Sequence, residues 1–531
     1  MRSQVTVRSA RRILCIYPRY GGVSITTFHY AYPLTDGVRA MMTPLGLLVI
    51  AGYLPDSWEV RFVDENISQA SDADFAWADA VLVSGMHVQH SAIVEVCHRA
   101  RAHGKPSALG GPSVSSSPER YPEFDYLHVG ELGDATDELI RALDADLARP
   151  EQQRVFTTRE RLPITDFPVP AYELSEASRY LLCTIQSSSG CPYTCEYCDI
   201  PALYGRQPRL KRPEQVLAEL DTMLVAGGTG AVFFVDDNFI GNKKAARELL
   251  PHIIAWQKAR GYPLMFSCEA TLNIAVSPEI LAMMREAYFV QVFCGLESPE
   301  LTALDAMQKS HNYRALPILD AVATINSYGV EVCCGIILGL DTDTAATADA
   351  IVDFAEAAHV PLLNPVLLEA LPKSPLWDRL TAAGRVDRSG ERVSNVIFTR
   401  SDEEVVADWR NVVRRIYAPE AVYRRFDWNF KHTYPNRIRP PLSRARLSAA
   451  NLRRGLVILL KLVTLVGIFG YYRRLFWRMA LSGLSEGLFY EVLSAGFTSH
   501  HLIRFAEDCA RQRAGFLEEA AQPVRAVARP A

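Results

Sequence analysis

The chain has 531 residues, which is too long for one hydrophobic core and predicts about three domains. Its net charge of −4 shows no basic excess, so nothing in the composition points to a nucleic-acid partner. Eleven cysteines are too few for a disulfide framework in a chain of this size and favour a reducing cytoplasm.

Residues 1–145 alternate short apolar runs with helix-like segments, such as Leu45–Leu54 and Ala92–Ala102. The first run is too short for the apolar core of a signal peptide and is interpreted as a strand. The alternation predicts an α/β domain with a doubly wound, Rossmann-like parallel sheet, whose ligand sits at the carboxyl ends of the strands. The predicted strands are Arg12–Tyr17, Trp58–Val63, Ala80–Ser84, Ser107–Leu109 and Tyr126–Val129.

Small residues follow three of these strands. Glycines at such positions let a large planar or phosphate-bearing ligand approach the backbone closely. A tight turn between strand and helix is the alternative for the Gly-Gly-Pro-Ser stretch taken alone. The candidate ligand contacts are Ser84, Gly85, Gly110, Gly111, Ser113, Gly130 and Glu131.

Residues 146–180 are predicted to be a linker. They begin with a polar stretch and continue with the proline-rich run Leu162–Ala171, which suits neither a helix nor a central strand. The regular apolar positions of this run indicate an extended strap that packs against its neighbours.

The stretch Ser189–Cys198 carries cysteines at the spacing C-x3-C-x2-C. Three thiolates from one loop can hold three corners of an iron–sulfur cube and leave the fourth iron without a protein ligand. A structural zinc ion needs a fourth ligand that is not found nearby, and a disulfide would leave an odd thiol. Three buried structural cysteines are the remaining alternative, which Gly190 and Pro192 disfavour because they mark a loop. The candidate metal ligands and catalytic residues are Cys191, Cys195 and Cys198.

With Tyr197 directly before the third cysteine, this loop resembles that of the radical S-adenosylmethionine (SAM) enzymes. The resemblance implies a [4Fe-4S] cluster whose open iron binds SAM and cleaves it to a 5′-deoxyadenosyl radical. The preceding domain resembles the cobalamin-binding domain of B12-dependent radical SAM enzymes. It lacks the D-x-H-x-x-G motif, which implies cobalamin without a histidine ligand; His87, past the third strand, is the residue that could still approach the corrin.

Residues 181–385 repeat strands and helices in a way that resembles the partial (β/α)6 barrel of the radical SAM enzymes. Reactive groups of such barrels lie at the carboxyl ends of the strands. The predicted strands are Leu181–Gln186, Ala231–Val235, Leu264–Cys268, Phe289–Cys294 and Glu331–Ile337. The predicted helices are Pro213–Leu224, Lys244–Lys258, Pro278–Ala287 and Asn312–Tyr328.

Polar residues at these strand ends are the SAM contacts that the resemblance implies. Capping of the next helix is the alternative for each acidic one. Arg206 or Arg209 could pair with the SAM carboxylate or the corrin side chains, or lie at the surface. Cys294, Cys333 and Cys334 are interpreted as packing thiols, with hydrogen-atom donation or shielding of the cobalt as the alternative. The implied SAM contacts are Tyr197, Asp236, Asp237, Asn238, Glu269, Glu297, Ser298 and Gly339.

Residues 386–531 are predicted to be mostly helical, and to dock a membrane or the substrate. The run Gly455–Tyr472 is almost wholly apolar and is flanked by arginines. A buried core helix and a basic, apolar helix lying on an anionic membrane are both open interpretations. A spanning helix is disfavoured, because Lys461 and two glycines interrupt the run.

Segments from Tyr17-Pro-Arg-Tyr20 to Ser499-His-His-Leu-Ile-Arg-Phe-Ala506 together resemble the hopanoid C-2 methylases over nearly the full length. This implies a cobalamin-dependent radical SAM C-methyltransferase. Its radical removes a hydrogen atom from an sp3 carbon of a polycyclic lipid, which then receives the methyl group carried by cobalamin. A reductant such as flavodoxin or ferredoxin and a cytoplasmic location, or a peripheral one at the inner membrane, are expected with it.

Two rival functions remain open at this point. One keeps the cofactors but methylates or cyclises another natural product. Methylthiolation is disfavoured, because the first domain offers only Cys15 and Cys97 for a second cluster. The other rival is a non-catalytic sensor of B12 or of an iron–sulfur cluster, which would bind cobalamin without cleaving SAM.

Overall fold

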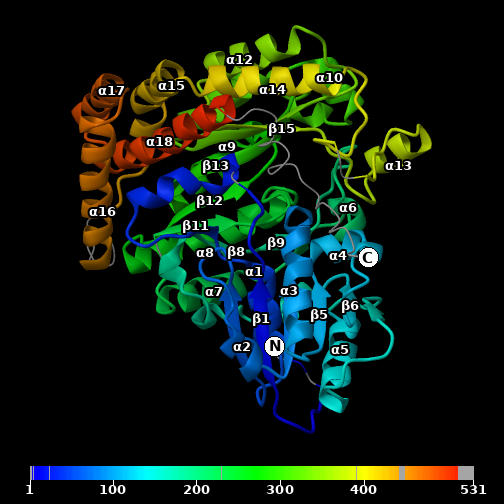
Figure 1. Cartoon of the computed structure of the whole chain (residues 1–531). Helices are drawn as coiled ribbons and strands as arrows, with labels where there is room; N and C mark the ends of the chain where they lie inside the picture. Colours follow the sequence, from blue (N-terminus) through cyan, green and yellow to red (C-terminus); the bar gives the residue numbers. More distant parts are fainter. Residues whose placement is uncertain are drawn as a thin grey trace.

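The structure is a computed structural model that describes residues 3, 5–22, 24–228, 230–389, 392–441 and 449–511. Two parallel sheets carry the fold, one above the other, and the C-terminal helices lie along the upper edge and one side (Figure 1). The part of the predicted C-terminal region at 512–531 lies outside the described residues.

The first sheet has six parallel strands in the order β3-β1-β4-β5-β6-β7. All five strands predicted for residues 1–145 are confirmed, and the strand order reverses between β1 and β4, where doubly wound sheets bind their ligands. Its strands are β1 Arg12–Tyr17, β3 Glu59–Asp64, β4 Ala80–Ser84, β5 Ser107–Gly110, β6 Tyr126–Val129 and β7 Arg154–Thr157. The helices between them are α1 Leu45–Tyr53, α2 Asp72–Trp77, α3 His90–Ala102, α4 Pro112–Ser116 and α5 Asp134–Ala145.

Two strands cross the predicted domain boundaries. β7 falls within residues 146–180, where the sequence predicts a linker, and it extends the first sheet by pairing with β6. β2 (Ala40–Met42) falls within residues 1–145 but pairs with β8 of the second sheet. Both are short edge strands, and Phe156 is the single buried residue of β7, so neither carries an apolar pattern that would indicate a strand.

The second sheet is the predicted partial barrel, with strand order β15-β14-β13-β12-β11-β8-β2 and parallel pairing throughout. The predicted helix Asn312–Tyr328 starts later than expected, because Pro317 precedes the first turn of α11. Its strands are β8 Tyr180–Ile185, β11 Ala231–Phe234, β12 Met265–Glu269, β13 Phe289–Glu297, β14 Glu331–Leu338 and β15 Leu363–Leu367. The barrel helices are α7 Pro213–Val225, α8 Lys243–Arg260, α9 Pro278–Ala287, α10 Leu301–Ala306, α11 Ile318–Ser327 and α12 Thr347–Ala357.

Helices make up most of the described C-terminal part, as predicted. The apolar run Gly455–Tyr472 is not one helix: α16 changes into a π-helical segment at Leu462, which ends at Ile468. No helix of the described ranges is long and apolar enough to cross a membrane. The C-terminal helices are α13 Pro375–Ala382, α14 Asp402–Ile416, α15 Pro419–His432, α16 Ala449–Lys461, α17 Arg473–Ser485 and α18 Phe489–Arg511.

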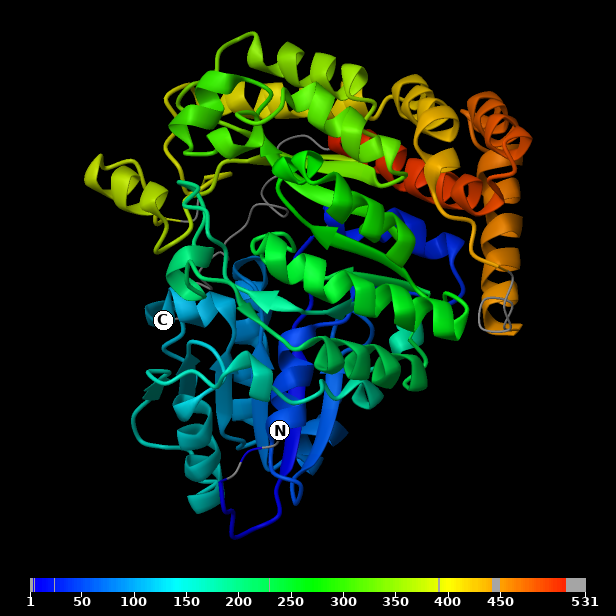
Figure 2. The same ribbon diagram turned by 180° about the vertical axis from the view of Figure 1, so that it is seen from behind.

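Figures 1 and 2 both place α16 and α17 at the outer edge, beside the sheets rather than between them. α18 runs inward from this edge and contacts α14, α15, α17 and the short helical turn His29–Leu34. The C-terminal helices are therefore tied to a segment near the N-terminus.

Candidate active site

The cysteine loop leaves β8 at the mouth of the barrel and is fixed at Gly190. This residue has φ +98°, and a Cβ atom there would lie 2.8 Å from the carbonyl oxygen of Gly205. Its N–H donates to Asp237 Oδ2 at 2.7 Å, and the N–H of Cys191 donates to the Gly205 carbonyl at 3.1 Å. The loop is therefore held between the end of β11 and the turn after α6 (Ile200–Leu203).

The three loop cysteines fit an iron–sulfur cluster. None of them forms a disulfide. Burial raises the pKa of each thiol, that of Cys198 to about 12, while the backbone N–H groups of Tyr193 and Ile200 lower the pKa of Cys191 and Cys198. Buried thiols with N–H donors beside them suit thiolates whose charge is balanced by iron. In the described ranges no three His, Cys, Asp or Glu side chains are grouped for a single metal ion, and a cube spreads its ligands over separate corners.

A buried lysine lies behind the cysteine loop. Lys309 Nζ donates to Glu297 Oε1 at 2.7 Å and to the Tyr197 hydroxyl at 2.5 Å, and that hydroxyl donates to the same Glu297 oxygen at 2.6 Å. The positive charge of Lys309 lowers the pKa of Cys195, against the larger effect of burial. Glu297 and Tyr197, which the sequence predicts as SAM contacts, therefore also anchor the loop to β13.

The sequence reasoning missed Lys309. The residue follows α10 in a polar stretch, Gln308-Lys309-Ser310-His311, which carries no apolar pattern to indicate burial. Its 4% exposure follows from the partners that surround it, which come from the cysteine loop and β13.

Carboxylates crowd the barrel mouth at the ends of β11, β12 and β13. Both oxygens of Asp236 are used locally, since they accept from the Ser187 and Ser188 backbone N–H groups and the Ser187 hydroxyl. Burial raises the pKa of Asp237 to about 6. The Glu269 side chain is exposed to solvent at the barrel mouth, but many protein atoms lie around it. The resulting loss of hydration, together with the charges of Asp237 and Asp236, raises its pKa to about 7. A cationic ligand would relieve the crowding, and SAM carries an ammonium and a sulfonium.

The other predicted SAM contacts have mixed surroundings. Asn238 is buried and lies close enough to Cys191 that its side chain lowers the pKa of this thiol, and its Nδ2 makes no hydrogen bond of normal geometry within the described part of the chain. Ser298 is buried and accepts from the Glu300 N–H at 3.1 Å. Gly339 has φ +91°, and a Cβ atom there would lie 2.5 Å from the Phe398 ring, so packing alone requires the glycine.

At the carboxyl edge of the first sheet the small residues meet as predicted. Gly111 has φ +96°, and a Cβ atom there would lie 2.5 Å from Ser84 Oγ and 3.6 Å from the Gly85 backbone. The Ser113 hydroxyl lies 2.5 Å from the Tyr121 hydroxyl and 3.2 Å from His87 Nδ1. These contacts bring the ends of β4 and β5 together and involve no charged side chain.

The remaining predicted contacts of this edge follow β5 and β6. A Cβ atom on Gly110 would lie 3.8 Å from the His128 side chain, in ordinary contact. Gly130 has φ +108° and donates its N–H to Ser115 Oγ at 2.9 Å.

Glu131 is held by two arginines, and its contact with cobalamin stays a prediction. Its carboxylate accepts from Arg209 at 2.6 Å and pairs with Arg161 at 3.1 Å, and Ser189 of the cysteine loop donates to it at 3.2 Å. Arg209, a candidate partner of SAM or the corrin, uses only its Nη2 in these contacts; its Nε and Nη1 are buried and have no hydrogen-bond partner in the described ranges. The ion pair therefore ties the first domain to the cysteine loop.

A cavity of about 1170 Å³ opens between the two sheets, above the roughly 300–1,000 Å³ that hold a drug-sized ligand. Its walls are the loops after β1, β3 and β4 and the stretch 116–120, together with parts of segments 24–42, 369–378, 387–389 and 392–395. Charged residues, among them Arg120, Glu369 and Arg392, lie in these walls. Ser116 lines it and donates to Asp199 Oδ2 at 3.3 Å, next to Cys198, so the cavity adjoins the cysteine loop. The seven predicted cobalamin contacts are not part of its lining, although His87 is.

His87 faces this cavity as a neutral imidazole. Burial lowers its pKa to about 4, its Nδ1 lies against Ser113, and its Nε2 has no hydrogen-bond partner among the described residues. Cys294, Cys333 and Cys334 are buried in β13 and β14, which supports packing thiols.

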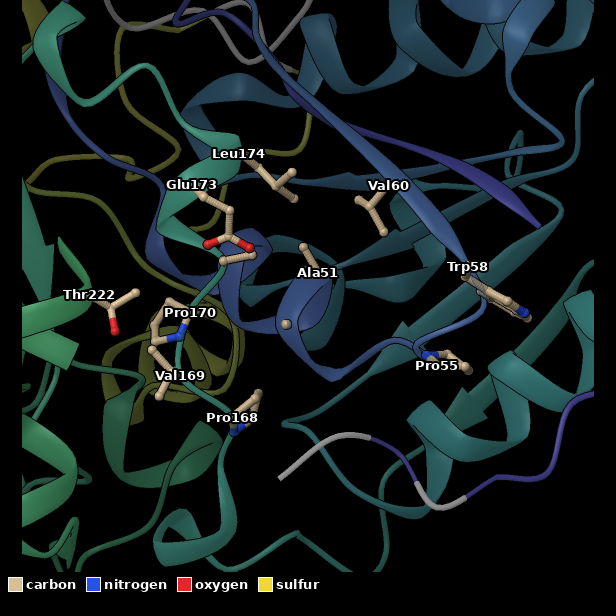
Figure 3. A pocket seen from close by; sticks show the side chains of 12 residues that line it. Ala51, Pro55, Trp58, Val60, Pro168, Val169, Pro170, Glu173, Leu174 and Thr222 are labelled. Atoms are coloured by element: carbon tan, nitrogen blue, oxygen red, sulfur yellow. The ribbon is translucent and has the colours of Figure 1, made fainter. Parts of the chain in front are cut away.

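A second cavity, of about 470 Å³, lies apart from these groups (Figure 3). The turn at Pro168–Leu174 lines one side, and Ala51, Pro55 and Trp58 line the other. Glu173 is its single charged lining residue, so this cavity offers no cluster of reactive side chains.

Three family profiles match successive parts of the chain. The B12 binding domain matches residues 34–140, the Radical SAM superfamily matches 185–355, and a domain of unknown function (DUF4070) matches 374–514. The order of these matches agrees with the positions of the first sheet, the barrel and the C-terminal helices.

Two solved structures share the fold. The cobalamin-dependent SAM radical enzyme OxsB, with aqua-cobalamin and SAM bound, has a TM-score of 0.59 at 14% identity, over 94% of this chain and 80% of that one. The radical SAM methyltransferase TsrM of Kitasatospora setae, with cobalamin and a [4Fe-4S] cluster bound, has a TM-score of 0.56 at 16% identity, over 72% and 79% of the chains.

Two relatives share more of the sequence. An uncharacterized methyltransferase of Synechocystis sp. (strain ATCC 27184 / PCC 6803 / Kazusa) is 36% identical over 77% of this chain and 76% of its own. The hopanoid C-2 methylase of Rhodopseudomonas palustris (strain TIE-1) is 54% identical over 97% of this chain and 98% of its own. With such identity along both whole chains, and a B12 binding domain before a radical SAM barrel, the protein belongs to the hopanoid C-2 methylase family of cobalamin-dependent radical SAM methyltransferases.

Proposed function

We propose that the protein methylates the C-2 carbon of a hopanoid. The observation that carries this proposal is the 54% identity to a hopanoid C-2 methylase along nearly the whole of both chains. A hopanoid is a rigid, apolar polycycle, and the large cavity between the two domains offers space beside the cysteine loop for such a substrate.

The proposal divides the work among three parts of the chain. Residues 1–145 together with β7 hold cobalamin, residues 181–385 hold the cluster and SAM, and the helical region from residue 386 docks a membrane or the substrate. When bound, the cluster, SAM and cobalamin supply the radical and the methyl group, which no side chain can provide. The protein supplies position, charge and exclusion of water.

In the barrel, the side chains hold a cation. We assign the three loop cysteines to the cluster, and Asp237 and Glu269 to the positive groups of SAM, because these two carboxylates have raised pKa values and the buried Lys309 donates its hydrogen bond to Glu297 instead of to them. Asp236 is a positioning residue, since its oxygens hold Ser187 and Ser188.

In the first domain, the residues offer shape rather than charge. We assign the carboxyl edge at Ser84, Gly85, Gly110, Gly111, Ser113 and Gly130 to cobalamin, and retain His87 as a cavity-lining imidazole whose Nε2 has no hydrogen-bond partner in the described part of the chain. His90 lines the same cavity, and its Nδ1 is also without a partner there. The reaction also requires a low-potential reductant such as flavodoxin or ferredoxin. The protein contacts the inner membrane peripherally, from the cytoplasmic side.

The test is deletion of the gene followed by mass spectrometry of the lipids. Loss of a C-2-methylated hopanoid, restored by the wild-type gene but not by one with Cys191, Cys195 and Cys198 replaced by alanine, is the expected result. Unchanged lipids in a strain that expresses the gene would remove the hopanoid assignment and favour another natural product as substrate.

A further inference from the structure

Two helices at the outer edge of the molecule expose apolar stripes. In α16 the side chains of Leu452, Leu456 and Leu460 are each 55–56% exposed, and a spacing of four places them along one side of the helix. In α17 the exposed side chains are Trp477, Leu481 and Leu484, at spacings of four and three. Such stripes normally pack against a core, but these face outward.

The connection between the two helices continues this surface. Phe469 is 78% exposed and Tyr471 is also exposed, while Leu462 and Val466 of the same segment are buried. One side of the apolar run from Gly455 therefore packs on the protein, and the other side is exposed to solvent. We call the exposed apolar side chains of residues 452–484 the docking face.

The segment that carries the docking face is mostly positive in charge, although Arg453 pairs with Asp36 and Arg478 lies near Asp427. Between Ala449 and Tyr490 there are six cationic residues and a single acidic one, Glu486. The cations are Arg453, Arg454, Lys461, Arg473, Arg474 and Arg478.

Arg473 and Arg474 form no ion pair within the described ranges and open α17, where the helix dipole is also positive. Negative charge from outside the protein would offset this cluster. A second copy of the chain would bring the same cations face to face, so self-association is disfavoured.

The docking face adjoins the wall of the large cavity. Arg453 pairs with Asp36 at 2.7 Å, and Lys461 Nζ donates to the Thr35 carbonyl at 2.7 Å. Thr35 and Asp36 follow the turn His29–Leu34, whose His29 and Tyr32 line the cavity. α16 is thus bonded to the segment that forms one cavity wall.

We propose that the docking face binds the surface of an anionic bilayer, with its apolar side chains in the boundary between headgroups and acyl chains and its arginines at the lipid phosphates. The face then presents the cavity wall formed by residues 24–42 to the membrane in which an apolar polycycle is dissolved. This names the lipid chemistry and the face for the peripheral contact of the proposed function, on which it rests for the identity of the substrate.

The test is flotation of the purified full-length protein with vesicles, in the absence of SAM and of any hopanoid. Vesicles of phosphatidylcholine with phosphatidylglycerol should carry the protein upward, and vesicles of phosphatidylcholine alone should carry much less. Leu456→Gln with Leu481→Gln should weaken partition about tenfold or more, and Arg473→Gln with Arg474→Gln about fivefold for each arginine.

Matched controls keep the result specific. Val225→Gln with Leu319→Gln replaces exposed apolar residues outside the docking face, and Arg314→Gln replaces an exposed arginine elsewhere; each should float like the wild type. Circular dichroism of every variant checks that it is folded.

Wild-type protein that floats with neither vesicle, or an apolar double variant that floats unchanged, would overturn the proposal. A dimer seen by sedimentation, lost in Leu456→Gln with Leu481→Gln and accompanied by no vesicle binding, would assign the face to self-association instead. Because no turnover is measured, the result is independent of whether the substrate is a hopanoid.

Discussion

The carboxyl edges of the two sheets face the same region of the molecule but are built from different chemistry. The barrel edge carries Asp236, Asp237, Glu269 and Glu297, against which the buried cation Lys309 is set. The edge of the first sheet carries glycines and hydroxyl groups, and its one predicted acid, Glu131, is paired with arginines.

On the proposed assignment, equivalent positions in the two parallel sheets select two kinds of ligand. Charge would select the cationic SAM at the barrel mouth, whereas the close approach of backbone would select the large corrin ring at the first sheet. Substitutions in the barrel should therefore act through charge and metal ligation, and those in the first domain through steric fit.

The largest effect is expected for the cysteine loop. Replacing Cys191, Cys195 and Cys198 with alanine removes every thiolate of the loop, so the purified protein should lose its iron and form no 5′-deoxyadenosine from SAM under reduction. Cys333→Ala, in a buried strand position, is the control and should keep both. Deoxyadenosine formation by the triple variant would contradict the assignment of the loop.

Next in size is the effect of Lys309→Met, which leaves the carboxylate of Glu297 buried without its cation. We expect the free energy of unfolding to fall by about 3 kcal/mol, measured by denaturant titration, together with slower SAM cleavage. Lys309→Arg keeps the charge and should recover part of both. An unchanged unfolding midpoint for Lys309→Met would show that the lysine does not anchor the loop.

A smaller effect is expected for Gly111→Ala in the first domain. Gly104 also has a positive φ, of +68°, but a Cβ atom there would meet nothing within 4 Å, so Gly104→Ala measures the cost of a positive φ without a steric contact. Gly111→Ala adds the contact with Ser84 and a backbone conformation, φ +96° and ψ −174°, that is nearly restricted to glycine. It should lose about 1–2 kcal/mol more stability and retain less cobalamin on gel filtration. Equal behaviour of the two variants would argue against a tight fit at this edge.

The smallest effect concerns pH. The pKa of Glu269 is raised to about 7, so its charged form, which suits a cation, increases as the pH rises through 7. SAM binding, followed by calorimetry, should tighten roughly tenfold from pH 6 to pH 8. Glu269→Gln removes the titration and should flatten this profile, whereas a profile that stays steep would assign the dependence to another group.

The same raised pKa affects the stability of the protein without SAM. Between the ordinary carboxyl value near 4.5 and 7, the unfolded chain releases a proton that the folded chain keeps. The contribution of Glu269 to stability should therefore fall as the pH rises across this window, and this loss should be absent in Glu269→Gln.

The sequence was most informative where the pattern is local. The spacing of Cys191, Cys195 and Cys198, and the alternation of apolar strands with helices, predicted the loop, the first sheet and the barrel. The short edge strands were not predicted, because Phe156 is the single buried residue of β7 and β2 pairs with a strand far away in the chain.

The partners of single side chains also escaped prediction. Asp236 looked like a ligand contact at a strand end, but the structure directs its oxygens to Ser187 and Ser188. Glu131 forms ion pairs with Arg209 and Arg161, and Lys309 forms an ion pair with Glu297. Each of these pairs joins residues that are not neighbours in the sequence, so no local pattern could indicate it.

The most direct test of the account is methyl transfer by the purified protein, reconstituted anaerobically with iron, sulfide and cobalamin. With methyl-labelled SAM, a reductant and a hopanoid that lacks the C-2 methyl group, the account predicts label on C-2 and deoxyadenosine in equal amount. Deoxyadenosine formed at the normal rate with no label entering any hopanoid supplied would contradict it.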